Sequence, residues 1–264
     1  MMRFLSLFRT GPGEKPGPFK AILNAVLVAA ALFLIFSASL AAIGVTLHFQ
    51  VLAGFEKRLA MGFLMTIKLS LASLVLSLVI GILSALGQIS RLLPVRYFSA
   101  IYVKFIRGTP LIMQIYLFFY IIGTAWGVSS RFWAGVMILS IFEGAYISEI
   151  VRGSLLSLDA TQLEAAKAVG FTQGQTTRYV IVPQLMQRTL PALTGQFASI
   201  IKDSSLLSMI AVIELTQTVR EISAINFRLF ECYFVLGLLY LALTLPLSMV
   251  TKRIERRFQY ENRA

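Results

Sequence analysis

The chain has 264 residues, of which 57% are hydrophobic and only 14% are charged, and its mean hydropathy is +0.79. A soluble domain carries roughly 25% charged residues, so a water-soluble globule of this length could not cover so much apolar surface. The composition therefore excludes a soluble globular protein and predicts a polytopic integral membrane protein.

The formal net charge of +12 does not indicate nucleic-acid binding, because the basic residues fall in short loops and tails between apolar segments. The only cysteine, Cys232, can form neither an internal disulfide nor a cysteine-based metal cluster. The lone histidine, His48, adjoins an apolar run and is expected at the membrane interface. We therefore expect no nucleic-acid partner, no metal site and no cofactor.

The chain begins with a predicted flexible cytoplasmic leader, residues 1–20, because Thr10–Pro18 is rich in glycine and proline and cannot hold a helix. Beyond it, several runs reach the length of about 20 apolar residues that a helix needs to cross the hydrocarbon core. Their approximate bounds are Ala21–Leu47, Gly62–Gln88, Gly108–Trp126, Trp133–Val151, Leu190–Leu215 and Tyr233–Val250. None shows the alternation of barrel strands, so the predicted fold is all-α, a polytopic membrane bundle of about six transmembrane helices.

The spans suggest a division of the chain into parts. The first span, residues 21–47, is interpreted as an additional N-terminal transmembrane helix, followed by an interfacial connector at His48–Ala60. The main transmembrane unit is then expected at residues 60–251, with a basic cytoplasmic tail at residues 252–264.

The basic residues gather on one side of the predicted spans. With the N-terminus inside, the outer segments would hold only Lys57, Arg58, Arg131, Arg220 and Arg228, whereas most other lysines and arginines would face inward. The positive-inside rule therefore places both termini in the cytoplasm. It also places there the polar segment between the fourth and fifth spans.

This polar segment, residues 159–183, has the sequence signals of two short helices joined by a turn. Asp159 and Thr161 are both candidate N-caps, and Thr161 with Glu164 three residues later fits a capping box. Strong helix formers follow Glu164. Gly170 then fits the C′ position, where a positive φ costs glycine little.

A second helix is predicted to start at Thr172, with Gln175 three residues later. Pro183 should disturb or end this helix before the next span. The first helix would present small alanines beside Leu163 and Val169, a face that the groove of a partner protein could approach closely. A cytoplasmic loop that packs only on its own bundle remains the alternative at this point.

The polar segment resembles the EAA loop, the signature of permease subunits in binding-protein-dependent ABC importers. The pattern is Glu-Ala-Ala, three residues, Gly, nine residues and an apolar-x-apolar-Pro ending. It is matched at Glu164, Ala165, Ala166, Gly170, Val180, Val182 and Pro183. Further stretches are similar to the polar amino-acid uptake branch of this family: Phe105–Leu111, Ala145–Gly153 and Ile201–Leu206. The resemblance extends from about Ala60 to Arg253.

The resemblance implies a type I ABC importer permease fold, with a cytoplasmic coupling helix around Leu163–Phe171 that lies in a groove of an ATPase subunit. It implies two ABC ATPase subunits, a second permease subunit of identical or homologous sequence, and an extracytoplasmic solute-binding protein, at a bacterial cytoplasmic (inner) membrane. The ATPase-coupling residues would be Glu164, Ala165, Ala166, Gly170 and Pro183. The chain has no Gly-x-x-x-x-Gly-Lys-Ser/Thr phosphate loop, so we expect no catalytic residues and ATP hydrolysis by the partner.

Charged residues within the spans are candidates for a translocation pathway. An ionised group costs about 2.5–3.5 kcal/mol at the centre of a spanning helix, so Glu143, in the fourth span, is expected to face the pathway or a partner. Glu149 lies one turn before Arg152 and is expected to form a local ion pair with it. Lys202 and Asp203, in the fifth span, are either a mutually neutralising pair or solute contacts.

The leading hypothesis is a transmembrane permease subunit that moves a polar amino acid at the expense of ATP hydrolysed by a partner. An ion-gradient-coupled secondary transporter is the first alternative, and it could use Glu143 or Asp203, but it gives no reason for a capped two-helix insert. A membrane scaffold without transport would not need intramembrane charges. A membrane enzyme is disfavoured because the chain has one histidine and no His-Glu-x-x-His pair.

Overall fold

The computed structural model describes residue 11 and residues 16–261, with side-chain environments up to residue 251 and at residue 253. The chain divides into two compact units, Met1–Phe49 and Gln50–Ala264. Most of the predicted leader at residues 1–20, and the side chains of the predicted basic tail at residues 252–264, lie outside the described part.

The described part of the N-terminal unit is dominated by one long helix, α2 (Pro18–Ala42). Pro18 occupies its first turn, where a missing backbone amide costs nothing. Beyond its C-terminus, Gly44 has a φ of +67°, the conformation in which helices commonly end. No residue of α2 is buried, and an apolar helix without a buried face is expected to be surrounded by lipid.

Two long helices form the centre of the larger unit, α3 (Glu56–Gln88) and α6 (Arg131–Leu156). They approach closely because small residues face the partner helix: a Cβ on Gly81 would lie 2.5 Å from the side chain of Ile147. The hydroxyl of Ser140 donates a hydrogen bond to the backbone carbonyl of Ser73 across the interface, at 3.2 Å. Small residues and cross-helix hydrogen bonds of this kind are typical of helices that pack in a membrane.

The helix that follows α3 ends in a sharp corner. Helix α4 (Leu93–Gly108) ends at Thr109, and α5 (Leu111–Tyr116) continues into a π-helical segment, η2 (Leu117–Gly123). The two parts are bent by 114°, because Pro110 lacks a backbone amide and holds Thr109 in an extended conformation. The predicted span Gly108–Trp126 therefore has the wrong start: the chain is already helical from Leu93 and turns at Pro110.

The C-terminal part contains α9 (Val182–Asp203), a 3₁₀ segment η4 (Ser204–Ile210), α10 (Leu215–Asn226) and α11 (Leu229–Glu261). The predicted fifth span, Leu190–Leu215, is wrong at both ends. Helix α9 begins eight residues earlier, at Val182, and ends at Asp203. Beyond η4 the chain turns through Ala211, whose φ is +55°.

Fewer helices could cross a membrane by themselves than the sequence predicted. Among the described residues, four helices are long and apolar enough to cross a membrane: α2, α3, α6 and residues 229–251 of α11. The number is five if the bent pair α4–α5 counts as one span. Helix α9 is not among them, because polar residues such as Gln184, Gln187 and Gln196 make it amphipathic. The fold is nevertheless all-helical, since the same residues contain no strand.

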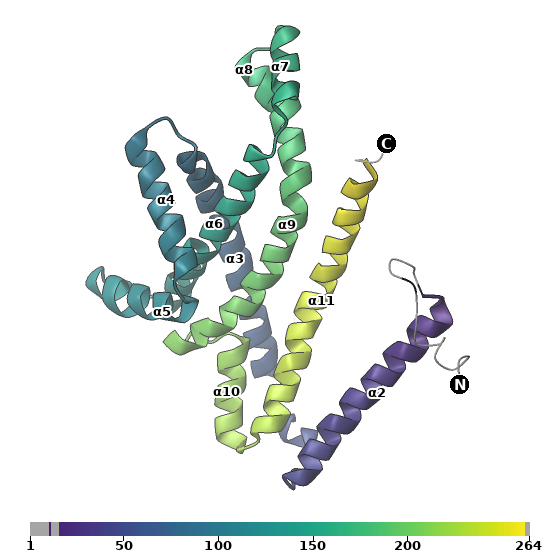
Figure 1. Cartoon of the computed structure of the whole chain (residues 1–264). Helices are drawn as coiled ribbons and strands as arrows, with labels where there is room; N and C mark the ends of the chain where they lie inside the picture. The colour runs from purple at the N-terminus through teal and green to yellow at the C-terminus, as the bar shows by residue number, and fades with distance from the viewer. Residues whose placement is uncertain (1–10, 12–15, 262–264) are drawn as a thin grey trace. The chain divides into compact units, whose positions relative to one another are not determined.

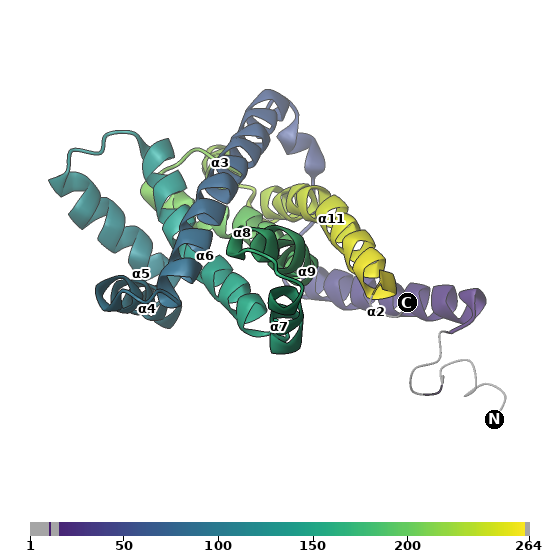
Figure 2. The ribbon, with the colours of Figure 1, turned by 90° about the horizontal axis from the view of Figure 1, so that it is seen from above.

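The core of the larger unit lies where α3, α6 and the α4–α5 corner meet η4. Its fully buried side chains include Leu69, Ile115, Leu139 and Leu207. Figures 1 and 2 show α4 and α5 on one side of the α3–α6 pair and α11 on the other. The two short helices α7 (Ala160–Ala168) and α8 (Gln173–Thr176) project beyond the ends of α6 and α9, at the opposite end of the unit from α10 (Figure 1).

Candidate functional site

The projecting hairpin α7–α8 begins with a side-chain cap. Asp159 is the N-cap of α7, and its carboxylate accepts a hydrogen bond of 2.9 Å from the backbone amide of Thr161. This bond lowers the pKa of Asp159 from its ordinary value. The predicted capping box of Thr161 and Glu164 is wrong, because α7 already starts at Ala160 and Thr161 lies inside its first turn.

The turn between the two helices depends on Gly170, whose φ is +80°. The amide of Gly170 bonds to the carbonyl of Lys167 and the amide of Phe171 to the carbonyl of Ala166, both at 3.0 Å, which is the Schellman pattern of a helix end. The predicted role of Gly170 at the C′ position is thereby confirmed. The predicted capping box of Thr172 and Gln175 is also present.

Pro183 does not end the second helix, contrary to one part of the prediction. Helix α8 passes through a π-helical turn, η3 (Thr177–Ile181), directly into α9, and Pro183 lies in the first turn of α9. The wider turn accommodates the missing proline amide. The hairpin is therefore connected to the bundle by continuous helix as far as Asp203.

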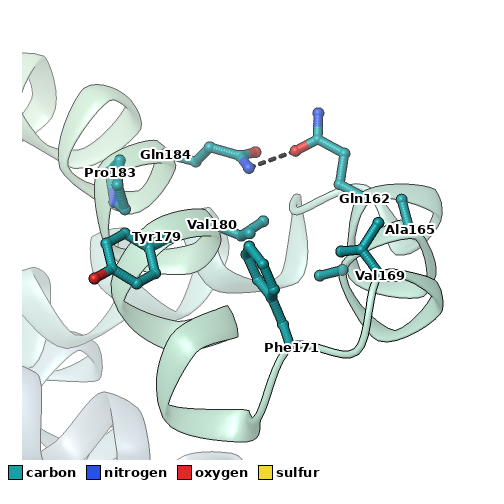
Figure 3. Close-up of a pocket in the computed structure, with 9 residues that line it drawn as sticks. Gln162, Ala165, Val169, Phe171, Tyr179, Val180, Pro183 and Gln184 are labelled. Atoms are coloured by element: carbon teal, nitrogen blue, oxygen red, sulfur yellow. Dashed lines mark hydrogen bonds between the residues drawn. The ribbon is translucent and has the colours of Figure 1, made fainter.

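A cavity of about 420 Å³ opens between α7 and the η3–α9 segment (Figure 3). The residues that line it are Gln162, Ala165, Ala166, Val169, Phe171, Tyr179, Val180, Pro183 and Gln184. The side-chain amide of Gln184 donates a hydrogen bond to the side-chain oxygen of Gln162 across its mouth. Of the predicted coupling residues, Ala165, Ala166 and Pro183 thus meet at one cavity, whereas Glu164 is exposed outside it and Gly170 shapes the turn.

The base of the hairpin is tied to the end of α6. Arg188 lies in α9, one turn after Gln184, which lines the cavity. Its guanidinium group donates hydrogen bonds to the backbone carbonyl and to the hydroxyl of Ser157, the latter at 2.6 Å. Ser157 is the C-cap of α6. A displacement of the hairpin would therefore move both α9 and the end of α6.

Within the bundle, Glu143 of α6 is completely buried and faces α9. The side chain of Gln196 donates a hydrogen bond to its Oε2 atom, while its Oε1 atom has no hydrogen-bond partner among the described residues. Asp203, seven residues after Gln196 and hence on the same face of α9, lies close enough to interact with Glu143. The sequence reasoning missed Gln196, although its seven-residue spacing from Asp203 was a usable signal.

Lys202 does not belong to this polar cluster. Its side chain is exposed and lines a separate cavity of about 360 Å³ between α9, α10 and α11, with Ser205, Thr216, Tyr233, Leu236, Gly237 and Tyr240. No ion pair joins Lys202 to Asp203 among the described residues. The mutually neutralising pair that the sequence left open is therefore wrong, because neighbouring residues on a helix point about 100° apart.

The predicted ion pair of Glu149 and Arg152 is confirmed, with an oxygen–nitrogen distance of 2.8 Å. Glu149 also accepts a hydrogen bond from Gln88 of α3 at 3.0 Å and pairs with Arg107 of α4 at 3.3 Å. Arg107 in turn lies over the ring of Tyr146, 5.4 Å from its centre. One carboxylate thus joins α3, α4 and α6, which the sequence spacing alone could not show.

The sequence reasoning also missed Glu214, which it had placed inside the fifth span. Glu214 is fully buried and caps α10, accepting hydrogen bonds from the amides of Thr216 and Gln217 at 2.7 and 2.8 Å. The hydroxyl of Tyr240 also donates to it, at 3.1 Å. Burial raises the pKa of Glu214 to about 7 despite these hydrogen bonds.

Taken together, the helical membrane unit, its projecting hairpin and its buried carboxylates define a transport protein of the membrane. The chain belongs to the family described as binding-protein-dependent transport system inner membrane component, whose profile matches residues 77–260. It is thus a multi-pass membrane permease of the ABC importer family. Membership of this family supports a permease of an ABC importer and not the ion-gradient-coupled alternative.

Relatives match over most of their own length. The chain is 36% identical over 197 residues to the L-cystine transport system permease protein TcyB of Bacillus subtilis (strain 168), covering 74% of this chain and 84% of that protein. It is 36% identical over 200 residues to the glutamine transport system permease protein GlnP of Escherichia coli (strain K12), covering 75% and 91%.

Solved structures share the fold. A chain from the crystal structure of an amino acid ABC transporter with histidines superposes with a TM-score of 0.74 and 33% identity, over 81% of this chain and all of that one. A chain of the MetNI methionine ABC transporter in an inward-facing conformation gives a TM-score of 0.65 at 20% identity, over 78% of this chain and 98% of that one, and supports the fold alone.

Proposed function

We infer that this permease moves a polar amino acid into the cytoplasm and is driven by ATPase subunits that grip its hairpin. The observation that carries this inference is the projecting, capped hairpin with small residues on its surface, in a chain without a phosphate-binding loop of its own. The named substrates of the relatives, L-cystine and glutamine, support an amino acid as the solute.

The hairpin residues have distinct roles in this proposal. Glu164 is exposed and available for polar contact with an ATPase, and the exposed Ala165 keeps the surface of α7 low enough for close approach. Ala166 is buried within the hairpin and would act by keeping it compact. Gly170 holds the angle between the two helices. Pro183 lies where the hairpin joins α9, so force on the hairpin passes along continuous helix into the bundle.

Two ATPase subunits would act on two permease subunits, identical or homologous, around one pathway. Closure of the ATPases on ATP would draw the two hairpins together, and the bundle would open outward to accept solute from a solute-binding protein. After hydrolysis the hairpins would separate and the pathway would face the cytoplasm. The lysine and arginine distribution supports cytoplasmic termini and a cytoplasmic hairpin.

The polar cluster of Glu143, Gln196 and Asp203 is proposed to border this pathway. A buried carboxylate oxygen without a hydrogen-bond partner is costly in a membrane, and a solute ammonium group or an ordered water would satisfy it. Lys202 borders the separate cavity next to α11, where it could contact the carboxylate of a solute.

The division of the chain is also a proposal. Relatives align with about three quarters of this chain but with most of their own length, which supports a permease unit at residues 60–251 preceded by an additional helix at residues 21–47. The basic segment at residues 252–264 would then be a cytoplasmic tail.

Reconstitution tests the proposal. The permease, its candidate ATPase and its candidate binding protein would be placed in vesicles, and uptake of labelled amino acids would be measured. Uptake that requires ATP and survives an uncoupler is expected. Uptake that collapses with the ion gradient and needs no ATP would instead establish a secondary transporter.

A further inference from the structure

Helix α4 carries a stripe of basic side chains along one side. The residues of the stripe, which follow one another at spacings of three or four residues, are Arg96, Ala100, Lys104 and Arg107. Such spacings place side chains on the same side of a helix. Arg107 pairs with Glu149 at 3.3 Å. Arg96 and Lys104 are exposed, and neither has an ion-pair partner among the described residues.

The chain around the stripe supplies no negative charge. No Asp or Glu occurs between Glu56 and Glu143, so neither α4 nor the turn between α3 and α4 contains an acidic side chain. This turn adds a further exposed cation, Arg91. Unpaired charges beside apolar surface are costly in a membrane. The two exposed cations of the stripe therefore require an anion from outside the chain.

The stripe borders an apolar face of α4 that is also exposed. Phe98 is 76% exposed and Ile101 66% exposed, whereas Ser99, Val103 and Ile106 are buried on the side of α4 that packs on the rest of the unit. Helix α4 thus presents a basic stripe and an apolar face side by side to its surroundings. This combination is typical of helices that contact anionic headgroups and acyl chains at the same time.

The spacing along the helix leaves room for a small anion between the two exposed cations. Lys104 lies eight residues beyond Arg96, about 12 Å along the helix axis. Ala100 lies midway between them and is half-buried, and its short side chain leaves a gap that both long basic side chains can reach. Figure 1 shows that α4 begins toward the end of the larger unit from which α7 and α8 project.

We propose that this gap binds the phosphate of an acidic phospholipid, whose acyl chains lie along the exposed apolar face of α4. Arg96 donates hydrogen bonds to the phosphate oxygens, and Lys104 adds a second positive charge. A headgroup with a net negative charge is preferred, because the cation of a zwitterionic headgroup would be repelled by the stripe. A soluble phosphate would match the charge but would leave Phe98 and Ile101 uncovered.

A lipid titration with a matched control tests the site. Phosphatidylglycerol is added to the detergent-solubilised full-length permease, and bound lipid is measured by native mass spectrometry. The test variant, Arg96→Gln with Lys104→Gln, removes both cations; the control, Lys57→Gln with Arg131→Gln, removes two exposed basic residues of other helices. Since each basic residue near an anionic surface contributes about fivefold in affinity, the test variant should bind roughly tenfold more weakly or worse. The control should stay within about twofold, and equal losses in the two variants would overturn the site.

Further variants separate charge from folding. Arg96→Lys with Lys104→Arg keeps both charges and should retain binding, whereas Ala100→Glu places an acid in the gap and should abolish it. Failure of either result would overturn the role of the gap.

The alternative occupants give different results. An equal loss of phosphatidylcholine binding in the test variant would refute the preference for an acidic headgroup. Displacement of the lipid by glycerol phosphate would identify a site for a soluble phosphate instead. A change in the number of permease copies, without a change in bound lipid, would identify a contact between copies. None of these measurements uses ATP or an ATPase, so the result does not depend on the proposed function.

Discussion

Gly170 controls the turn of the α7–α8 hairpin, and its replacement tests the proposed coupling role of the hairpin most directly. Its φ is +80°, and the amide of Phe171 closes the turn by bonding to the carbonyl of Ala166 at 3.0 Å. A Cβ added at Gly170 would meet no other atom within 4 Å. Gly170→Val therefore acts through the backbone alone.

The size of the effect follows from the backbone angle. An L-residue held in the left-handed region costs about 1–2 kcal/mol, and a β-branched side chain is among the least tolerated there. A cost of this size increases the population of the opened turn by a factor of roughly 5–30. Under the proposed function the ATPase grips an ordered hairpin, so ATP-driven uptake should fall in proportion to the ordered fraction that is lost, and by that factor at most.

The assay combines amide hydrogen exchange of the hairpin with uptake into vesicles. Gly174→Val is the matched control, since Gly174 lies in α8 without a positive φ and its added Cβ would also meet no atom within 4 Å. We expect faster exchange around residue 170 and reduced uptake in Gly170→Val only. Equal exchange and equal uptake in the two variants would refute the reasoning.

Other changes have defined outcomes as well. Glu143→Gln and Asp203→Asn should each slow ATP-driven uptake at normal expression, because each alters the polar cluster between α6 and α9; unchanged rates and selectivity in both would remove these residues from the pathway. Glu149→Gln should lower the midpoint of thermal unfolding, because Arg152 would lose its charged partner. Hydrogen bonds to a charged group contribute about 1.5–3 kcal/mol. An unchanged midpoint would contradict this prediction. The pKa of Asp159 is lowered by its bond to the backbone, so the cap stabilises α7 above about pH 4 and is lost as the pH falls below that value. A spin label on α7 should therefore become more mobile on acidification, and Asp159→Asn, which retains a capping side chain, should abolish that response.

The hairpin was predictable from sequence because its determinants are local. A cap, a run of helix formers and a glycine act within a few residues of one another, so Gly170 and the capping box of Thr172 and Gln175 were predicted correctly. The sequence left Asp159 and Thr161 both open as N-caps of the first helix, and the structure confirms Asp159. Both signals fitted, and only the start of α7 at Ala160 decided between them.

The spans were less predictable, because a hydropathy pattern does not reveal how a chain bends. The predicted span Gly108–Trp126 does not reveal that the chain turns by 114° between α4 and α5, where Pro110 caps α5. The predicted first residue of α9 lies too far along the chain, because the amphipathic first half of this helix has a hydropathy similar to that of a loop. Helix α9 packs against α6 and α11, which the hydropathy pattern does not reveal.

The membrane class, the helical fold and the two-helix hairpin were determined by the sequence alone, because composition and short-range capping depend on neighbouring residues. The tertiary structure alone decided which polar groups of different helices meet. Glu143 and Gln196 are separated by 53 residues, and Lys202 and Asp203, although adjacent, point to different cavities or clusters. The neighbouring helix that a given side chain faces is decided only when the helices of the bundle pack together.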